Sequence, residues 1–368
     1  MAIVGGGIAG VALAWRLAAR FSVVVLERED GLGFHATGRS AAEWSLVHAE
    51  GLTRVLTAAS APFLEAPPAG FADQPLVRRR GNVVYVRPGG LEAFADLLAH
   101  GRTLQQDLQE ISPREAAGRA PFLDPDRLSA AFWDPLNGEI DVDALLTGCQ
   151  RAARRAGAVF RTGVTLHGAE RQADRWRLAT SDGPVDADLL VNAAGPWADA
   201  VARQCGADPL GLQARRRTAI TFDPAEGLDI RGLPSADDAE SGFYIKPEGG
   251  RLMACPGDAT PSEPCDARPE EIDVATAAWM AEEVTGRPVR RLGATWAGLR
   301  TYAPDDQPVA GWDPKVRDLF WLAGLGGAGL MTSPALSAAA AAILETGDTP
   351  PALARDGITA VALSPARL

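Results

Sequence analysis

The N-terminal residues alternate between apolar runs and a glycine-rich turn. Residues 2–4 are apolar, residues 5–10 contain the glycines, and residues 11–20 are rich in Ala and Leu at helical spacing. A second apolar run, residues 22–26, follows and ends at Glu27. Apolar runs of this length bounded by turns are typical of buried strands. The pattern therefore predicts a strand, a tight turn, a helix and a second strand parallel to the first.

The turn has the spacing Gly-x-Gly-x-x-Gly, at Gly5, Gly7 and Gly10. Gly5 would permit the tight turn, Gly7 would let the backbone approach a pyrophosphate, and Gly10 would let the helix pack closely on the strand. The helix N-terminus would offer N–H donors to the phosphates, and Glu27 is placed to accept hydrogen bonds from an adenosine ribose. A structural turn without a ligand is the alternative, but the strand, helix and acid in register favour dinucleotide binding.

The middle of the chain mixes the two periodicities. Residues 31–42 form a Gly-, Thr- and Ser-rich loop that is expected to open another helix, capped by Thr37 or Ser40, whose donors would face a phosphate. Residues 70–86 and 129–140 have strand-like patterns, with a helical stretch at 91–109 between them. Asp141 is the expected cap of an amphipathic helix, 142–156, that ends at Gly157.

The second half is mostly strand-like and returns to the pattern of the first domain. The predicted strands are 159–166, 175–180, 185–187, 189–192, most of 217–300 and 320–323, with one helix at 272–285. Residues 193–197 form a strand–turn–helix junction, and residues 324–329 form a glycine loop before a long Ala-rich helix. Each junction would point a helix N-terminus at the cofactor, so we expect two domains that are interleaved in sequence.

Composition narrows the class of protein. The 368 residues suit two domains, and the net charge of -11 argues against a nucleic-acid surface, since the two Arg runs (78–80 and 215–217) are short. The four cysteines have no metal-ligand or disulfide spacing, which predicts no metal and a reducing compartment. The apolar stretch 319–343 is broken by glycines and polar residues, so no membrane segment is expected. The glycine motif begins four residues from the start, which leaves no room for a signal peptide, and we expect a cytoplasmic protein.

Seven stretches resemble the FAD-dependent D-amino-acid oxidase and dehydrogenase superfamily, and most of all its bacterial D-arginine dehydrogenase branch. They are 26–29 (Leu-Glu-Arg-Glu), 35–42 (His-Ala-Thr-Gly-Arg-Ser-Ala-Ala), 56–60 (Leu-Thr-Ala-Ala-Ser), 191–195 (Val-Asn-Ala-Ala-Gly), 243–247 (Phe-Tyr-Ile-Lys-Pro), 295–300 (Thr-Trp-Ala-Gly-Leu-Arg) and 364–368 (Ser-Pro-Ala-Arg-Leu). They follow the family's order over nearly the whole chain. The resemblance implies an α/β fold in which a Rossmann-like FAD-binding domain is interleaved with a mainly antiparallel β-sheet substrate domain.

The resemblance also implies domain bounds and a non-covalent FAD. The FAD-binding domain would comprise residues 1–45, 142–215 and 305–368, and the substrate domain residues 46–141 and 216–304. Besides Gly5, Gly7, Gly10 and Glu27, the implied cofactor-binding residues are Arg28, Thr37, Arg39, Ser40, Ala41, Ala194, Gly195, Trp197, Gly326, Gly327, Gly329 and Thr332. The last glycines would let backbone N–H groups approach the flavin pyrimidine, where negative charge develops on reduction.

On the substrate side, the resemblance makes Arg217 and Arg300 the pair that binds the substrate carboxylate, with Tyr244 donating its phenol to the same group. Arg suits this role because it forms planar bidentate pairs with carboxylates. The neighbouring Arg215 and Arg216 leave the assignment of the second arginine open.

Three positions depart from the D-arginine dehydrogenase branch. Asn82 stands where that branch has the glutamate that pairs with the substrate guanidinium. His48 replaces a tyrosine of the active-site lid, and its own role is either catalytic or one of packing. Glu43 replaces a nearby histidine. The loss of the carboxylate favours a neutral D-amino acid. Glu43 would be the cation partner if D-arginine or D-lysine is the substrate after all.

The expected reaction is hydride transfer from Cα to flavin N5, which gives a 2-imino acid that hydrolyses to a 2-oxo acid and ammonia. The electron acceptor would be O2 or a quinone-type carrier. An FAD-dependent 2-hydroxy-acid dehydrogenase would use the same two arginines and is the close alternative. A cofactor-binding scaffold without catalysis is disfavoured, because it has no use for Arg217, Tyr244 and Arg300 together.

Overall fold

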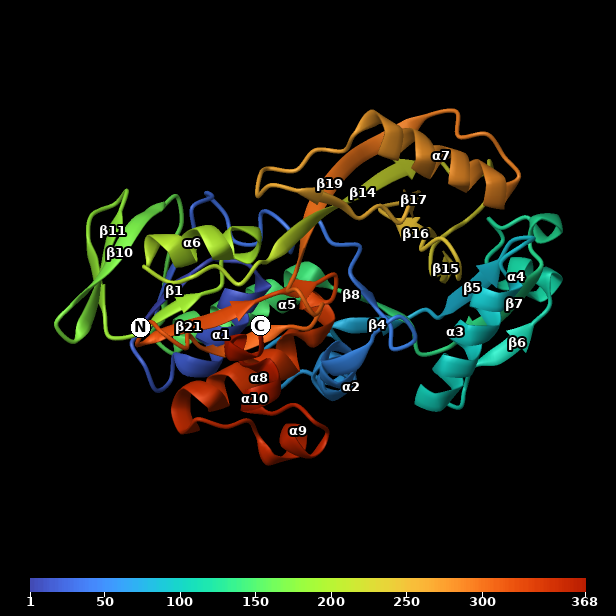
Figure 1. The fold of residues 1–368 in the computed structure, drawn as a ribbon. Helices are drawn as coiled ribbons and strands as arrows, with labels where there is room; N and C mark the ends of the chain where they lie inside the picture. Colours follow the sequence, from blue (N-terminus) through green and yellow to red (C-terminus); the bar gives the residue numbers. More distant parts are fainter.

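The computed structural model describes residues 1–368 and contains two large sheets side by side (Figure 1). The first is six-stranded, in the order β20-β21-β13-β1-β2-β9. All its neighbouring pairs are parallel except β20 with β21. Its strands are β1 (Ala2–Val4), β2 (Val24–Leu26), β9 (Val159–Arg161), β13 (Leu190–Asn192), β20 (Val309–Trp312) and β21 (Leu319–Ala323). Parallel strands need apolar side chains on both faces, and the short runs of β1, β13 and β21 are buried throughout.

Helices cover one face of this sheet. They are α1 (Ile8–Leu17), α5 (Val142–Arg155) and α8 (Gly329–Thr346), with α2 (Gly51–Glu65) packed on α8. Leu13, Leu17, Val25, Phe320 and Leu336 form the centre of this core. The helix α2 comes from the segment that the sequence assigns to the substrate domain, yet its fully buried Leu56 belongs to the same core.

The other face carries a small antiparallel sheet, β10 (Leu166–Gln172), β11 (Arg175–Thr180) and β12 (Val185–Ala187), together with α6 (Ala198–Gln204). The fully buried Trp176 joins this layer to Trp321 of β21. Short helices complete the chain: η1 (Pro125–Arg127), η2 (Gly195–Trp197), α9 (Pro351–Arg355), α10 (Ala360–Leu363) and η3 (Pro365–Arg367).

The second large sheet is mainly antiparallel, in the order β22-β19-β14-β17-β16-β15-β5-β7-β6, with β18 paired to β14. Its strands are β5 (Asn82–Val86), β6 (Gln109–Ile111), β7 (Ala130–Asp134), β14 (Gln213–Phe222), β15 (Ser235–Asp238), β16 (Tyr244–Glu248), β17 (Arg251–Cys255), β18 (Thr260–Ser262), β19 (Leu292–Tyr302) and β22 (Leu325–Gly326). The helices α3 (Leu91–Leu104), α4 (Pro113–Arg119) and α7 (Glu271–Thr285) lie along it (Figure 1). A three-stranded sheet, β3 (Glu43–Trp44), β8 (Gly138–Ile140) and β4 (Val77–Arg79), lies between the large sheets.

The fold class inferred from the sequence is confirmed, and so are several elements. Asp141 caps α5 by accepting a hydrogen bond from the Ala144 N–H at 2.8 Å, and α7 lies where the helix at 272–285 was expected. The helix expected to open within 31–42 is wrong, because residues 32–39 form turns that lead into β3. Gly33 and Ala42 have φ values of 72° and 58°, which a helix does not allow. No helix of the structure has the length and apolar character that crossing a membrane requires.

Candidate active site

A cavity of about 320 Å³ opens at the carboxyl ends of the parallel strands, where open α/β sheets bind their ligands. It contains nearly all of the residues that the sequence singled out. Those that line it are Gly5, Gly7, Glu27, Arg28, Thr37, Arg39, Ser40, Ala41, Ala194, Gly195, Trp197, Arg217, Tyr244, Arg300, Gly326, Gly327 and Gly329. The exceptions are Gly10, Thr332, Glu43, His48 and Asn82. The two halves of the predicted site thus share one cavity.

The glycine turn has the geometry that the motif predicts. Gly5 has φ of 112°, and a Cβ there would lie 2.3 Å from the carbonyl oxygen of Ala193. A Cβ on Gly10 would lie 2.1 Å from the carbonyl oxygen of Gly5, so Gly10 serves close packing beneath the cavity rather than its lining. A Cβ on Gly7 would stand 3.3 Å from the Thr37 hydroxyl, at the N-terminus of α1. Only a chain without side chains here leaves room for a pyrophosphate at this helix end.

Glu27 follows β2 and fixes the turn. Its two carboxylate oxygens accept hydrogen bonds from the N–H groups of Gly6 at 2.7 Å and Glu29 at 2.9 Å. Each carboxylate oxygen can accept a second bond, and the side chain lines the cavity. The carboxylate can therefore hold the turn and still accept a hydrogen bond from a ribose.

Thr37 and Ser40 are used differently from the expected helix caps. The Thr37 hydroxyl accepts a hydrogen bond from the Ile8 N–H at 3.0 Å, and Ser40 accepts one from the Ala42 N–H at 3.0 Å. Thr37 therefore ties its loop to the first turn of α1, and no new helix is needed to explain its position. This also accounts for the error in the predicted helix.

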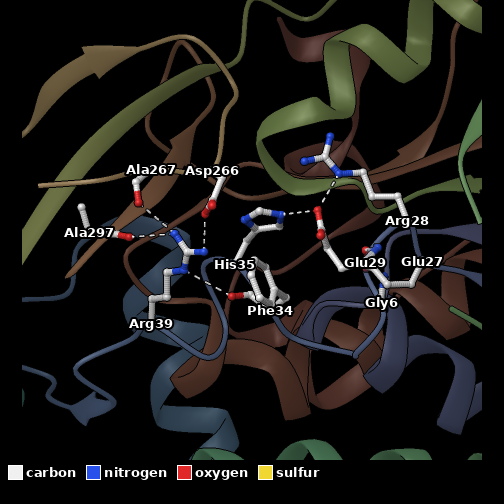
Figure 2. A network of polar contacts seen from close by, with 10 residues as sticks. All are labelled: Gly6, Glu27, Arg28, Glu29, Phe34, His35, Arg39, Asp266, Ala267 and Ala297. Atoms are coloured by element: carbon white, nitrogen blue, oxygen red, sulfur yellow. Dashed lines mark hydrogen bonds and ion pairs between the residues drawn. The ribbon is translucent and has the colours of Figure 1, made fainter. Parts of the chain in front are cut away.

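An aromatic and charged group surrounds the outer end of the cavity. The guanidinium of Arg28 lies 4.0 Å above the Trp197 ring, and the His35 ring lies 4.7 Å from the same ring. Glu29 pairs with both His35 and Arg28 at 2.9 Å (Figure 2). The hydrogen bond from His35 is the main reason that the pKa of Glu29 is lowered. His35 and Glu29 were not among the predicted site residues, although both lie in stretches that carry the resemblance.

In the glycine loop of residues 324–329, the backbone packs closely against Arg300. A Cβ on Gly327 would lie 3.1 Å from the guanidinium of Arg300, and one on Gly326 would lie 2.8 Å from the Tyr302 ring. Gly329 begins α8 and lines the cavity. Thr332 does not reach the cavity, because it is buried and its hydroxyl donates to the Ala328 carbonyl oxygen at 2.8 Å.

Arg217 of β14, Tyr244 of β16 and Arg300 of β19 face the cavity from one antiparallel sheet, in which β19 pairs with β14 and β17 lies between β14 and β16. Burial, and then the charge of Arg300, lower the pKa of Arg217. Its Nε is buried without a hydrogen-bond partner. Burial raises the pKa of Tyr244 well above its ordinary value, which keeps the phenol protonated as a donor. Two arginines and a phenol without an ion-paired protein carboxylate have the chemistry to bind a small carboxylate.

Strand alternation and ion pairing distinguish the three consecutive arginines of β14. Arg216 points to the opposite face and pairs with Glu270 at 2.7 Å and Asp273 at 3.2 Å. Arg215 pairs with Asp306 at 3.4 Å outside the cavity. Arg217 is thus the arginine of β14 that lines the cavity.

Cys255 is a cavity residue that the sequence analysis missed. It lies opposite Tyr244 in the pairing of β16 with β17 and lines the cavity. Burial raises the pKa of its thiol to about 11, so it is neutral at ordinary pH. The spacing of the cysteines was informative only about metal binding and disulfides. No local sequence pattern indicated that Cys255 would line a cavity.

Glu43, His48 and Asn82 lie outside the cavity lining, and Glu43 and His48 form a polar cluster with Asp237. The His48 Nε2 lies 3.1 Å from the Asp237 carboxylate, and Asn82 is fully buried with both amide atoms unpartnered. Burial, and then the charge of Asp237, raise the pKa of Glu43 to about 7. Burial alone would lower the pKa of His48, but the hydrogen bond and charge of Asp237 raise it. Asp237 had no sequence signal, since it lies in a strand that the pattern did not resolve.

Known proteins resemble this chain in sequence and in fold. The profile of the DAO family, described as FAD dependent oxidoreductase, matches residues 1–343. The chain is 26% identical over 366 residues to a glycine oxidase of Geobacillus kaustophilus (strain HTA426), covering 95% of the chain and 93% of that protein. It is 25% identical over 262 residues to the mitochondrial sarcosine dehydrogenase of Homo sapiens, covering 66% of the chain but only 28% of that protein.

Solved structures share the fold. The L-proline dehydrogenase of P. horikoshii has a TM-score of 0.84 at 21% identity, covering 100% of this chain and 96% of that one. The glycine oxidase from Geobacillus kaustophilus has a TM-score of 0.81 at 22% identity, covering 94% of each chain. These likenesses support the superfamily inferred from the sequence, but not specifically its D-arginine dehydrogenase branch.

Proposed function

Because the chain belongs to the DAO family of FAD-dependent oxidoreductases, we propose that it oxidises a D-amino acid held by Arg217, Tyr244 and Arg300 beside a non-covalently bound FAD. The class, an FAD-dependent oxidoreductase, follows from the family match. The configuration of the substrate, its side chain and the roles of the individual residues are the proposal.

The residues present fit FAD. The glycine turn and the N-terminus of α1 would hold the pyrophosphate, Glu27 the ribose, and the loop from Gly326 to Gly329 the flavin pyrimidine. When bound, FAD supplies the acceptor for the hydrogen and electron pair that leave Cα.

The observation that carries the proposal is the pair of arginines in the same cavity as the glycine turn. Arg217 has an unpartnered Nε and a pKa lowered by burial and by Arg300, so a carboxylate between the two guanidinium groups would relieve their repulsion. Tyr244 remains a phenol and can donate to the same carboxylate. Fixing the carboxylate in this way orients Cα, and orientation is what this chain contributes to the reaction. A scaffold that only binds FAD has no need of this arrangement.

The polar cluster supports an uncharged side chain. The Asp237 carboxylate is already paired with His48 at 3.1 Å. Because the pKa of Glu43 is raised to about 7, a fraction of the molecules carry a neutral Glu43 near pH 7. Asn82 offers only an uncharged amide. A cationic side chain, as in D-arginine or D-lysine, is the second candidate, because Glu43 and Asp237 together place two carboxylates near the clamp.

A 2-hydroxy acid would fit the same carboxylate clamp, so the leaving group separates the two reactions. Oxidation of a primary amino acid releases ammonia after the imino acid hydrolyses, and oxidation of a hydroxy acid does not. Glycine, sarcosine and proline also belong among the test substrates, since these are named for the relatives. Sarcosine and proline are secondary amines that release no ammonia, so their turnover is followed by reduction of the electron acceptor.

The experiment is a panel of D- and L-amino acids, these small amines and 2-hydroxy acids, assayed with an artificial electron acceptor. Ammonia is measured, and a parallel set of assays without the artificial acceptor is run with and without O2. We expect turnover with ammonia release on uncharged D-amino acids. Turnover confined to L-amino acids or to hydroxy acids would contradict the proposed substrate. Activity that depends on O2 would identify O2 as the acceptor.

A further inference from the structure

The guanidinium of Arg39 is almost fully used by the protein itself. Its Nη2 donates to the Asp266 carboxylate at 2.5 Å, and its Nη1 to the carbonyl oxygens of Ala267 at 3.0 Å and Ala297 at 3.2 Å. Its Nε donates to the Phe34 carbonyl oxygen at 3.3 Å (Figure 2). An arginine has five N–H groups, so little donor capacity is left for a phosphate. The side chain is 17% exposed and lies at the cavity wall.

The backbone of Arg39 contacts β19, the strand that contains Ala297. The indole N–H of Trp296 donates to the Arg39 carbonyl oxygen at 3.1 Å. A Cβ on the cavity-lining Gly298 would touch the Cβ of Arg39 at 3.4 Å. Residues 296–298 of β19 are therefore contacted by Arg39 through its backbone, its guanidinium and its Cβ. Arg300 lies two residues further along this strand.

The other end of the Arg39 loop is anchored to the cofactor turn. The Gly33 N–H donates to the Gly6 carbonyl oxygen at 2.9 Å, and Thr37 accepts from Ile8 at 3.0 Å. The Arg39 N–H donates to the His35 carbonyl oxygen at 3.1 Å. One short loop thus connects the turn that would hold the pyrophosphate to the strand that carries Arg300.

We propose that Arg39 is a positioning residue that fixes β19, and with it the carboxylate-binding Arg300, relative to the cofactor turn. This inference rests on the proposed function to the extent that it takes Arg300 as the carboxylate ligand. The bonds that matter are those to the carbonyl oxygens of Ala267 and Ala297. The Asp266 carboxylate is 56% exposed, and exposed ion pairs contribute little. Displacement of a binding group by about 1 Å can lower a rate constant about 100-fold.

The test compares wild type, Arg39→Ala, Arg39→Lys, Asp266→Asn and Arg268→Ala, all as FAD-loaded enzymes. The probe is acetate, whose binding is followed by the perturbation of the flavin absorbance spectrum. The affinity of each apoprotein for FAD is measured separately by fluorescence. Arg268 is the matched control, because it is an exposed arginine of the same segment as Asp266.

We expect the Kd of acetate to rise at least tenfold in Arg39→Ala, while the Kd of FAD changes less than threefold. Arg39→Lys should recover part of the loss, and Asp266→Asn and Arg268→Ala should stay within about twofold of wild type. In an Arg300→Ala background, Arg39→Ala should have no further effect on acetate, because its action runs through Arg300. A residue needed only for folding would lower Tm without this non-additivity.

Three results would overturn the inference. A large loss of FAD affinity with unchanged acetate binding would make Arg39 a cofactor ligand. An effect of Arg39→Ala that persists undiminished without Arg300 would show that it does not act through the clamp. If acetate does not bind wild type, the clamp itself fails. That result would count against the proposed function itself, and it is recognised because neither wild type nor any variant then shows acetate binding.

Discussion

Asp237 lies directly opposite Tyr244 in the antiparallel pairing of β15 with β16. Side chains at such opposed positions project to the same face of a sheet, about 5 Å apart. Tyr244 therefore lies between the proposed carboxylate clamp and the polar cluster of Glu43, His48 and Asp237. A substrate whose carboxylate lies on Arg217 and Arg300 would extend its side chain along this face, from Tyr244 toward Asp237.

Arg300→Ala should cost about 3 kcal/mol of transition-state binding, or about two decades in kcat/KM, because a charge-assisted bidentate pair is lost. Arg300→Lys should also be poor, since an ammonium group cannot copy the fork of a guanidinium. Steady-state kinetics on the best substrate checks this, with Asn82→Ala as the milder comparison. Near-native turnover of Arg300→Ala would exclude Arg300 as the carboxylate ligand.

Arg217→Ala and Arg215→Ala should differ sharply, although the two residues lie on the same strand. Arg217 lines the cavity with an unpartnered Nε, whereas Arg215 makes an ion pair at 3.4 Å outside it. We expect kcat/KM to fall roughly tenfold or more in Arg217→Ala and to change less than threefold in Arg215→Ala. Equal effects would mean that the assignment along β14 is wrong.

Substrate preference should respond to charge at Asn82 and at Glu43. Wild type should favour D-methionine over D-arginine, and Asn82→Glu should shift the ratio of kcat/KM toward D-arginine by roughly 1–3 kcal/mol if the position stays dry. Kinetics of wild type, Asn82→Glu and Glu43→Gln with both substrates provide the measurement. A wild-type preference for D-arginine that disappears in Glu43→Gln would establish the cationic alternative.

Glu43 should make stability depend on pH. Its pKa in the folded protein is raised to about 7, above the ordinary value of 4.5, by burial and by Asp237. The folded state therefore binds a proton that the unfolded state releases between these pH values. Any favourable contribution of the protonated carboxyl is complete below pH 4.5 and is lost as the pH rises to 7. The free energy of unfolding of wild type, relative to Glu43→Gln, should fall by on the order of 2 kcal/mol over this range. Urea titrations at pH 5 and pH 8 measure it, and a constant difference would refute the prediction.

The purified protein should be yellow and should release its flavin on acid precipitation. Non-covalent contacts with the glycine turn are lost when the protein unfolds, whereas a covalent bond would survive. The absorbance of supernatant and pellet distinguishes the two. Flavin that stays in the pellet would rule out non-covalent binding, and a protein that cannot be loaded with FAD would contradict the whole assignment.

The cofactor half of the site was predictable because its physics is local. Gly5, Gly7 and Gly10 are required by a turn of a few residues, and Glu27 follows the next strand at a fixed spacing. The cap of α5 by Asp141 is local in the same way. Such features are present in the sequence before any tertiary contact is known.

The rest depends on contacts between distant segments. Thr37 satisfies the N–H of Ile8, which lies 29 residues away, and this contact replaces the helix that the local pattern predicted. Asp237 meets Tyr244 through strand order and His48 through the turn that follows β3. The bonds of Arg39 reach residues more than 220 positions away. Local periodicity contains no information about such pairings.

The late return of the chain to the six-stranded sheet has a consequence during synthesis. The strand β13 is flanked by β1, made first, and by β21, made near the end. At about 5–20 residues per second, the ribosome takes roughly 7–26 s to make the segment between β13 and β21. During that interval the β13 edge at Leu190 and Val191 lacks its partner strand, and an unpaired apolar edge of this kind can recruit other strands. The strand β21 that covers this edge and the cavity-lining loop from Gly326 to Gly329 come from the same late segment, so we expect protection of the edge and the capacity to bind FAD to arise at nearly the same stage of synthesis.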